Sequence, residues 1–222
     1  MLPRSPATLK RSRIVQTATA IREAAANAGF IDIQSEPPRP RNGVDTPALL
    51  ATVFGVIASR PALAAFRFCA ANRWVTGTHS RTVMLRFRGA AGEHSHLAEY
   101  TAEGDYPAVL CGTDEAPAPV EWLLHALATC LAAGIANIAA TRGITLRRVQ
   151  SSLEGDIDLC RISGPPDEAR AGHRSIRVVV EIQGDGPPDV LRDIVEHSRD
   201  RSAVFDILAN GVPVAVAVDA VP

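Results

Sequence analysis

The feature that most constrains the fold is a long apolar segment flanked by segments with a different hydrophobic period. Pro117 and Pro119 open a predicted helix over residues 120–142, and Gly143 ends it. Large aliphatic side chains recur at helical spacing on one side of it: Leu124, Leu127, Leu131, Ile135 and Ile138. A helix with one continuous apolar side must pack that side against a core.

Before this helix, the chain alternates in the manner of half-buried strands. Val83, Leu85 and Phe87 point to one face of a predicted strand, residues 89–92 form a turn, and residues 97–101 return as its partner. The elements predicted after the long helix are strand, strand, helix and closing strand, at residues 144–159, 174–183, 187–199 and 212–218. This order is typical of an α+β fold with a largely antiparallel sheet.

The first 70 residues differ from the rest. Apolar residues at helical spacing predict a helix over residues 13–28, and the prolines of residues 36–43 predict a linker. Thr46 and Pro47 predict the start of a second helix, with Thr46 as its N-cap. We therefore expect a helical N-terminal appendage and linker at residues 1–70 and one α+β domain at residues 71–222.

Charge and cysteine content exclude several classes of function. Lys+Arg 23 against Asp+Glu 24 gives a net charge of −1, which lacks the basic excess that nucleic-acid binding requires. The four cysteines are Cys69, Cys111, Cys130 and Cys160, and no two of them form a Cys-x-x-Cys pair. We therefore expect no metal, no cofactor and no nucleic-acid partner.

The sequence also predicts where the protein resides. Residues 1–20 lack the apolar core of a secretory signal, and we identify no apolar run that approaches the roughly 18 residues of a membrane-spanning helix. Few, widely spaced cysteines favour a reducing compartment. We expect a protein of the bacterial cytoplasm without a membrane partner.

Cys130 is the residue of the long helix whose side chain could be most reactive. It lies on a ridge of small side chains, and most cysteines in such positions are small buried hydrophobes. A reactive thiolate there would need a cationic neighbour from elsewhere in the fold. His125 and Glu121 cannot serve it, since they lie roughly 140° and 180° around the same helix.

Residues 112–130 closely resemble the signature of the OsmC/Ohr superfamily, the osmotically inducible and organic hydroperoxide resistance proteins. That signature is a glycine loop followed by Pro-x-Glu-x-Leu-Leu-x-Ala-Leu-x-x-Cys, and this chain has Gly112, Pro119, Glu121 and Cys130 at the matching positions. Residues 151–159 and 201–214 resemble two further family elements. The resemblance spans about residues 73–220. It implies an OsmC-like domain with a sheet wrapped around the long central helix, in an intertwined homodimer.

The resemblance assigns a role to Cys130. It matches the peroxidatic cysteine, whose thiolate attacks a peroxide O–O bond to give a sulfenic acid. In the family a resolving cysteine then forms a disulfide, which a dithiol reductant reopens. Here the resolving position is Ser202, and serine cannot form a disulfide. The chain is therefore similar to a one-cysteine branch of the superfamily.

The family residues that keep the thiolate charged are also altered. Val120 stands where many members carry the glutamate that orients an arginine, and Glu121 matches an acid one place later. No arginine lies between Glu99 and Arg142, so Arg81 is the substitute that the sequence offers. The expected catalytic set is Cys130, Glu121 and Arg81.

The sequence is compatible with three hypotheses. The first is a thiol-dependent organic hydroperoxide reductase in oxidative-stress defence, resolved by an external thiol reductant or by Cys111 or Cys160. The alternative is a non-catalytic dimer that binds an apolar small molecule in a pocket lined by Val120, Trp74 and Phe205. A third is a cysteine hydrolase or acyl transferase, with a histidine drawn from His79, His173 and His197.

Overall fold

The computed structural model describes residues 41–158 and 172–221. The chain forms two compact units, Met1–Pro119 and Val120–Pro222. The helix predicted over residues 13–28 and the candidate resolving residue Cys160 lie outside the described residues. The predicted domain limit at residue 70 stays a prediction.

The described part of the first unit begins with a short helical segment. The α-helix α2 spans Thr46–Leu50 and continues as a π-helix, η1, over Ala51–Ile57; a 3-10 turn, η2, comes next at Pro61–Ala64. The N-cap is Asp45, whose carboxylate accepts the Ala48 N–H at 3.1 Å, and not Thr46 as the sequence predicted. Both residues are common N-caps, so the local sequence alone did not distinguish them.

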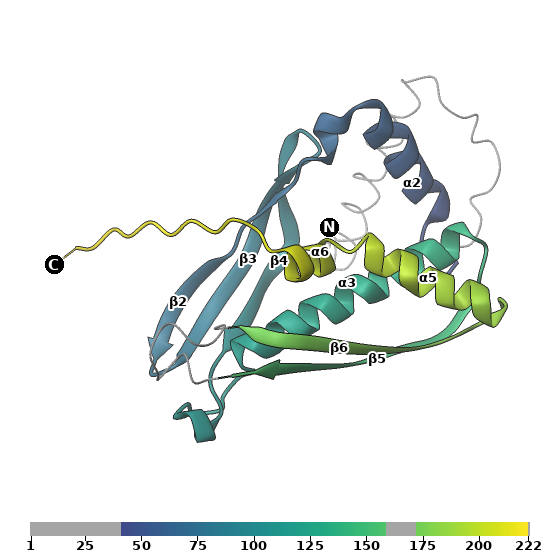
Figure 1. Cartoon of the computed structure of the whole chain (residues 1–222). Coiled ribbons are helices and arrows are strands. Elements are labelled where there is room, and N and C mark those ends of the chain that lie inside the picture. Colours follow the sequence, from purple (N-terminus) through teal and green to yellow (C-terminus); the bar gives the residue numbers. More distant parts are fainter. Residues whose placement is uncertain (1–40, 159–171, 222) are drawn as a thin grey trace, which may run out of the picture. The chain divides into compact units, whose positions relative to one another are not determined.

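A four-stranded antiparallel sheet follows in the first unit (Figure 1). Its strands are β1 (Arg67–Phe68), β2 (Ala71–Thr76), β3 (His79–Gly89) and β4 (Gly92–Gly104), and β1, β2 and β4 all pair with β3. The predicted turn at residues 89–92 is confirmed. Its central residues, Ala90 and Ala91, have φ values of 47° and 61°, as a tight two-residue hairpin turn requires.

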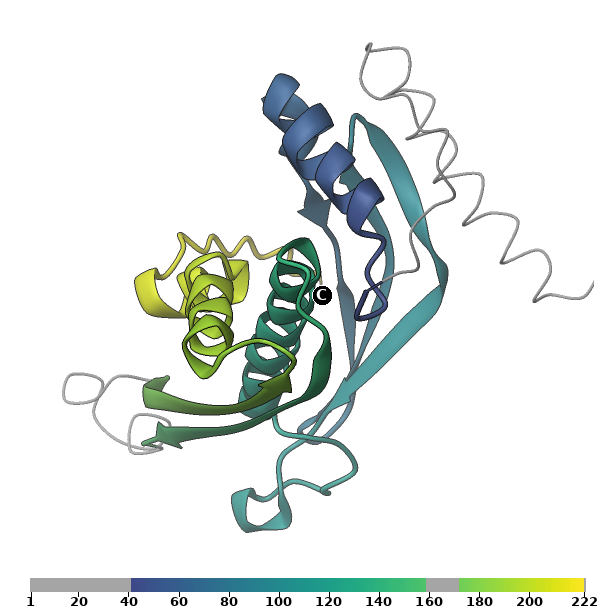
Figure 2. The same ribbon diagram turned by 90° about the vertical axis from the view of Figure 1, so that its right-hand side faces the viewer.

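The second unit is built around one hairpin and three helices. Its elements are α3 (Pro119–Thr141), β5 (Leu146–Ile157), β6 (His173–Gly184), α5 (Pro188–Asp200) and α6 (Ala203–Asn210). β5 and β6 pair antiparallel, and α3 and α5 lie on the same side of this hairpin (Figure 2). The predicted α+β class with antiparallel sheet is therefore confirmed.

The core of the second unit lies between its helices and the hairpin. Ile135 and Ala139 of α3 meet Leu191 and Ile194 of α5, and all four are buried. Half-buried residues of β5 and β6 pack against this cluster: Leu146, Val149, Val180 and Ile182. These side chains alternate along each strand with exposed ones, so the period-2 pattern that predicted the strands also selected the face turned toward the helices.

The long helix corrects one expectation. α3 has 23 residues and contains an 18-residue stretch with a mean hydropathy of 1.8, so by length and composition it could cross a membrane, contrary to the expectation that no run approaches this length. Polar residues such as His125 and Asn137 interrupt the aliphatic ones without adding a charge, which hides the run in the sequence. The helix nevertheless buries a ridge in the protein core: Leu127, Leu131, Ile135, Ala139 and Ala140. Core helices of this kind pass the same length test, and nothing else in the described residues points to a membrane.

The predicted closing strand is also corrected. After Gly211 the chain continues as an extended segment that the structure assigns to no sheet (Figure 1). Its alternating valines are exposed, with 81% of Val214 and 84% of both Val216 and Val218 accessible. A strand needs backbone partners, and the described residues of this single chain supply none to the segment.

Candidate functional site

The candidate site lies in the second unit, where the middle of α3 meets the junction of α5 and α6. Cys130 is half-buried and directly precedes Leu131, a member of the buried ridge of α3. The sulfur therefore lies at the margin of the core, where a neighbouring element can reach it.

Ser202 is that neighbour. It lies between α5 and α6, is 4% exposed, and its Oγ is 3.1 Å from the sulfur of Cys130. The same Oγ accepts the Phe205 N–H at 3.1 Å and so forms the N-cap of α6. A hydroxyl has one proton to donate. With the backbone N–H as incoming donor, the Ser202 hydroxyl is left to donate its proton to Cys130.

A close approach of α3 and α5 sets this contact. Ser198 of α5 donates to the Leu131 carbonyl at 2.8 Å, and Gly134 lies directly beneath it. A Cβ added at Gly134 would lie 2.3 Å from the Ser198 Oγ, so only glycine allows the helices to come so near. α5 therefore packs on the small side chains of α3 that the sequence places around Cys130. Ser202 follows Ser198 by one helical turn, so this packing brings it to Cys130.

Ion pairs also tie α5 to the end of α3. Arg142 donates to the carboxylate of Asp193, which in turn is 3.1 Å from His197 Nδ1. The Arg142 guanidinium, and to a lesser extent His197, hold the pKa of Asp193 below its usual value. These charged residues hold α5 against the end of α3 and do not contact the thiol. In the described part of the second unit, the Ser202 hydroxyl is the only hydrogen-bond partner of the Cys130 sulfur.

The other predicted site residues of the second unit lie on the same two helices as the thiol contact. Val120 is half-buried and Glu121 is exposed, both in the first turn of α3, nine or more residues before Cys130. Phe205 is 36% exposed, and its backbone N–H is the one that Ser202 caps. His173 and His197, considered for hydrolase chemistry, form no hydrogen bond with Cys130; the His173 ring lies over Gly155 of the hairpin.

Arg81 and Trp74 belong to the first unit, so their position relative to Cys130 stays a prediction. Arg81 is already paired, with its Nε 2.7 Å and a terminal nitrogen 2.6 Å from the Glu103 carboxylate. His79, which is buried, holds the other oxygen of Glu103 at 2.9 Å. The His79 hydrogen bond and then that of Arg81 lower the pKa of Glu103. Trp74 is 69% exposed and donates its indole N–H to the Gly77 carbonyl.

Sequence reasoning missed the residue that organises the glycine loop ahead of α3. Asp105 is fully buried and accepts the hydroxyl protons of Thr78 and Thr113 at 2.5 and 2.6 Å. It also accepts backbone N–H groups of the loop, at Thr113 and Glu115. These bonds, that of the Thr113 hydroxyl foremost, hold the pKa of Asp105 far below its usual value. No local pattern predicts such a residue, because its donors lie 27 residues before it and eight to ten residues after it.

Comparison with known proteins finds one matching protein family. A family model described as OsmC-like protein matches residues 112–217. No protein with a curated description matches the chain.

Several solved structures are similar to this chain at low identity. An OsmC-like protein from Mycoplasma pneumoniae is 17% identical, with a TM-score of 0.49 over 65% of this chain and 88% of that one. An organic hydroperoxide resistance protein OsmC from Legionella pneumophila is 14% identical, with a TM-score of 0.43 over 67% and 93%. An OsmC-like hydroperoxide resistance protein from Jannaschia sp. CCS1 is 12% identical, with a TM-score of 0.38 over 70% and 95%. The match of residues 112–217 to the family model, and not these structures, supports the assignment to the OsmC/Ohr superfamily.

Proposed function

Because residues 112–217 form an OsmC-like domain, which places the chain in the OsmC/Ohr superfamily, we propose that it is a thiol-dependent hydroperoxide reductase acting through Cys130. The observation that carries the proposal is the 3.1 Å hydrogen bond from the Ser202 hydroxyl to the Cys130 sulfur. A donor aimed at sulfur stabilises the anionic, nucleophilic form of a thiol and also the oxygen that oxidation adds beside it.

The reaction then proceeds in two balanced steps. The Cys130 thiolate attacks one peroxide oxygen, the O–O bond breaks, and the products are a sulfenic acid and an alcohol after one proton is taken up. Ser202 cannot form a disulfide with the oxidised sulfur. Two molecules of an external thiol therefore reduce the sulfenic acid, releasing water and leaving a small-molecule disulfide and the free Cys130 thiol.

The Glu121 and Arg81 roles are proposed on the resemblance alone. Glu121 lies in the first turn of α3. Arg81 is paired with Glu103, so to act on the thiolate the Arg81 guanidinium would have to contact both Glu103 and the Cys130 sulfur. The substrate that we propose is an organic hydroperoxide, as the resemblance implies. Phe205, whose N–H the Ser202 hydroxyl accepts, supplies an apolar side chain beside the site.

A second candidate is an apolar-ligand binder without catalysis. Its support is that the described residues of the second unit place no cation on the Cys130 sulfur, which weakens the case for a permanently charged thiolate. Under this candidate Val120, Phe205 and Trp74 would contact the ligand, and replacement of Cys130 would leave binding intact.

The proposal is tested by measuring consumption of cumene hydroperoxide with dithiothreitol as reductant. Cys130→Ser should lower the rate by about 100-fold or more, since the nucleophile is lost. Cys111→Ser is the matched control, because Cys111 is an exposed thiol in the first unit, and it should retain the full rate. Equal slow consumption by the wild type and Cys130→Ser would refute peroxidase chemistry; ligand-induced thermal stabilisation that survives Cys130→Ala would then support the binder.

We also propose a homodimer in the bacterial cytoplasm, whose reduced thiol pool would supply the external reductant. The exposed valines after Gly211 support a second copy as the missing strand partner, since Val214, Val216 and Val218 alternate as a strand does. Exposed apolar side chains on the helices, Leu123 and Ile207, add surface that a partner would cover.

A further inference from the structure

One face of the first unit's sheet gathers three arginines that the proposed peroxidase does not use. Arg67 lies directly opposite Arg88, and Arg88 lies opposite Glu93 on the next strand. Arg86 is two residues from Arg88 and lies opposite Ser95. Residues that are opposite across strands, or two apart along one strand, project from the same face. The pairing of β1, β3 and β4 therefore puts all five side chains on one surface.

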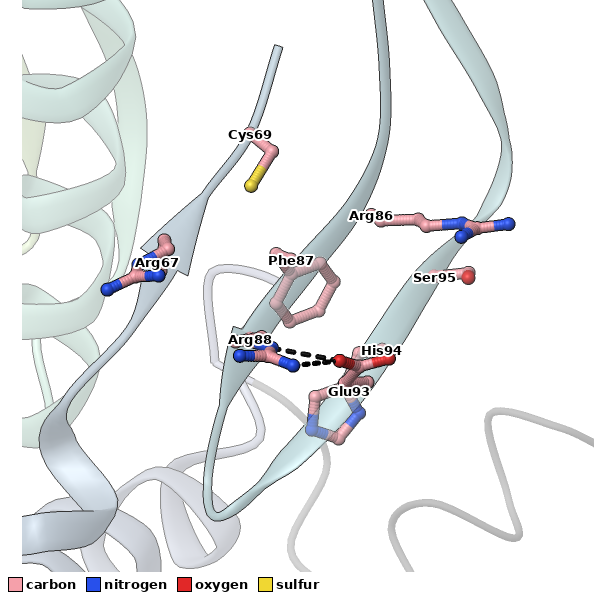
Figure 3. Close-up of a pocket in the computed structure, with 8 residues that line it drawn as sticks. All are labelled: Arg67, Cys69, Arg86, Phe87, Arg88, Glu93, His94 and Ser95. Carbon is pink, nitrogen blue, oxygen red and sulfur yellow. Dashed lines mark hydrogen bonds and ion pairs between the residues drawn. The ribbon is translucent and has the colours of Figure 1, made fainter.

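These residues line a pocket of about 480 Å³ that also contains a thiol (Figure 3). Cys69 comes directly after β1, is exposed, and lies at the pocket with its sulfur free. Phe87 and His94 also line the pocket; Phe87 alternates with the arginines along β3, His94 lies opposite it on β4, and their rings stack with centroids 5.2 Å apart. The pocket thus combines positive charge and a nucleophile. We call it the Cys69 pocket.

The charge of the Cys69 pocket is unbalanced. Its one carboxylate, Glu93, is bound by Arg88, whose Nε lies 2.9 Å away. That hydrogen bond keeps the pKa of Glu93 below its usual value, so Glu93 stays ionised and occupied. In the described parts of the chain, Arg67 and Arg86 form no ion pair. Two guanidiniums remain available for an external anion, with the planar geometry that carboxylates fit.

We propose that the Cys69 pocket is a second thiol site, which binds a small disulfide bearing carboxylates and exchanges with it. The carboxylates bind Arg67 and Arg86. The Cys69 sulfur attacks one sulfur of the bound disulfide, its S–S bond breaks, and a mixed disulfide forms while the other half leaves as a thiolate. Cys69 is oxidised and the small disulfide is reduced; a second small thiol reverses the exchange. No step uses Cys130.

Cys111 provides an internal comparison. It is an exposed free thiol of the same unit, at the C-cap of the 3-10 turn η3 (Ala108–Leu110), but the loop after it carries Asp114 and Glu115 and no arginine. An anionic reagent is therefore attracted to Cys69 and repelled from Cys111, whereas a cationic reagent has the opposite preference.

The experiment compares glutathione disulfide, which is anionic, with cystamine, which is cationic, on the full-length protein. Modification of each cysteine is measured by mass spectrometry of the intact protein and of its peptides. The quantity compared is the rate of modification of Cys69 divided by that of Cys111. This rate ratio should be about tenfold higher with glutathione disulfide than with cystamine, and 0.5 M salt should reduce the difference between the two reagents.

Variants identify the arginines as the cause. Arg67→Gln with Arg86→Gln should abolish the preference of Cys69, and the matched pair Arg67→Lys with Arg86→Lys should keep most of it because the charge remains. Arg73→Gln, an exposed arginine of β2 outside the pocket, should change nothing. A charge preference that survives the double Gln substitution, or an equal preference at Cys111, would overturn the proposal. Cumene hydroperoxide consumption by Cys69→Ser separates this site from Cys130, since it should equal that of the wild type.

Discussion

At the scale of single residues, one hydroxyl serves both the fold and the proposed chemistry. Ser202 caps α6 through the Phe205 N–H and donates to the Cys130 sulfur. The two functions need the same oxygen in the same place, so any substitution there changes helix stability and thiol environment together. The position also determines how an oxidised Cys130 is reduced, because a serine leaves the sulfenic acid for a reductant from solution.

Replacing this oxygen by sulfur should create a disulfide. The Ser202 Oγ and the Cys130 Sγ are 3.1 Å apart, and small side-chain rotations bring two sulfurs from such a separation to bonding distance. We expect Ser202→Cys treated with one equivalent of cumene hydroperoxide to lose two hydrogen atoms by intact mass and two free thiols by titration.

The control is Ser202→Ala under the same treatment, which should gain one oxygen at Cys130 and form no bond between these positions. Persistence of both thiols in Ser202→Cys after peroxide treatment would show that Cys130 is not oxidised, or that the two side chains are farther apart in solution.

At the scale of elements, the glycine loop before α3 depends on one buried carboxylate. Asp105 connects the end of β4 to Thr78 and to the loop residues Thr113 and Glu115. That loop directly precedes α3 in the sequence, so Asp105 fixes the conformation of the segment that leads into the helix.

Asp105→Asn should therefore lower the Tm at neutral pH, by about 5 °C, because an amide accepts fewer of these protons and brings donors of its own. The pKa of Asp105 is lower in the folded chain than in the unfolded one. The stabilisation is then fully present above the unfolded value of about 4 and is lost as pH falls below it.

The measurement is the Tm difference between wild type and Asp105→Asn across pH. It should be constant from about pH 5 to 8 and shrink steadily below about pH 4. Asp189→Asn, at an exposed position in the first turn of α5, is the control and should show a small difference. A Tm difference for Asp105→Asn that does not change with pH would contradict the role given to its charge.

At the scale of the whole molecule, the C-terminal segment has no partner within the described residues of its own chain. Residues 212–218 have strand periodicity and exposed valines, and an unpaired strand of this kind associates with another chain. We expect a chain ending at Gly211 to be monomeric at concentrations where the full chain is dimeric, as measured by light scattering coupled to size-exclusion chromatography.

A matched variant keeps the length and removes only backbone pairing. Proline at Val214 and Val216 lacks the N–H that a strand partner needs, so it should act like the truncation, whereas Val214→Thr with Val216→Thr should remain dimeric. A full-length chain that is already monomeric would refute the homodimer itself.

Patterns set by near neighbours in the sequence predicted much of this protein. The period of the apolar residues predicted β3, β4, β5, β6, α3 and α5, because burial of one face is enough to select strand or helix. The motif around Cys130 pointed to the OsmC/Ohr superfamily, whose model matches residues 112–217, and the resemblance of residues 201–214 pointed to Ser202. The pairing of Arg81 with Glu103 and the buried role of Asp105 could not be predicted, since each joins residues that are distant in the sequence.

The sequence by itself determined the order of elements, the helix that presents Cys130, and the lack of a cysteine at position 202. The tertiary structure alone decided that the Ser202 hydroxyl is directed at that sulfur, that Asp105 fastens the loop before α3, and that Arg67, Arg86 and Arg88 share one face with Cys69 nearby. The physical reason is the range of the interactions. Hydrophobic periodicity acts within a few residues, whereas hydrogen bonds and charge clusters arise only when strand register and helix packing bring remote segments together.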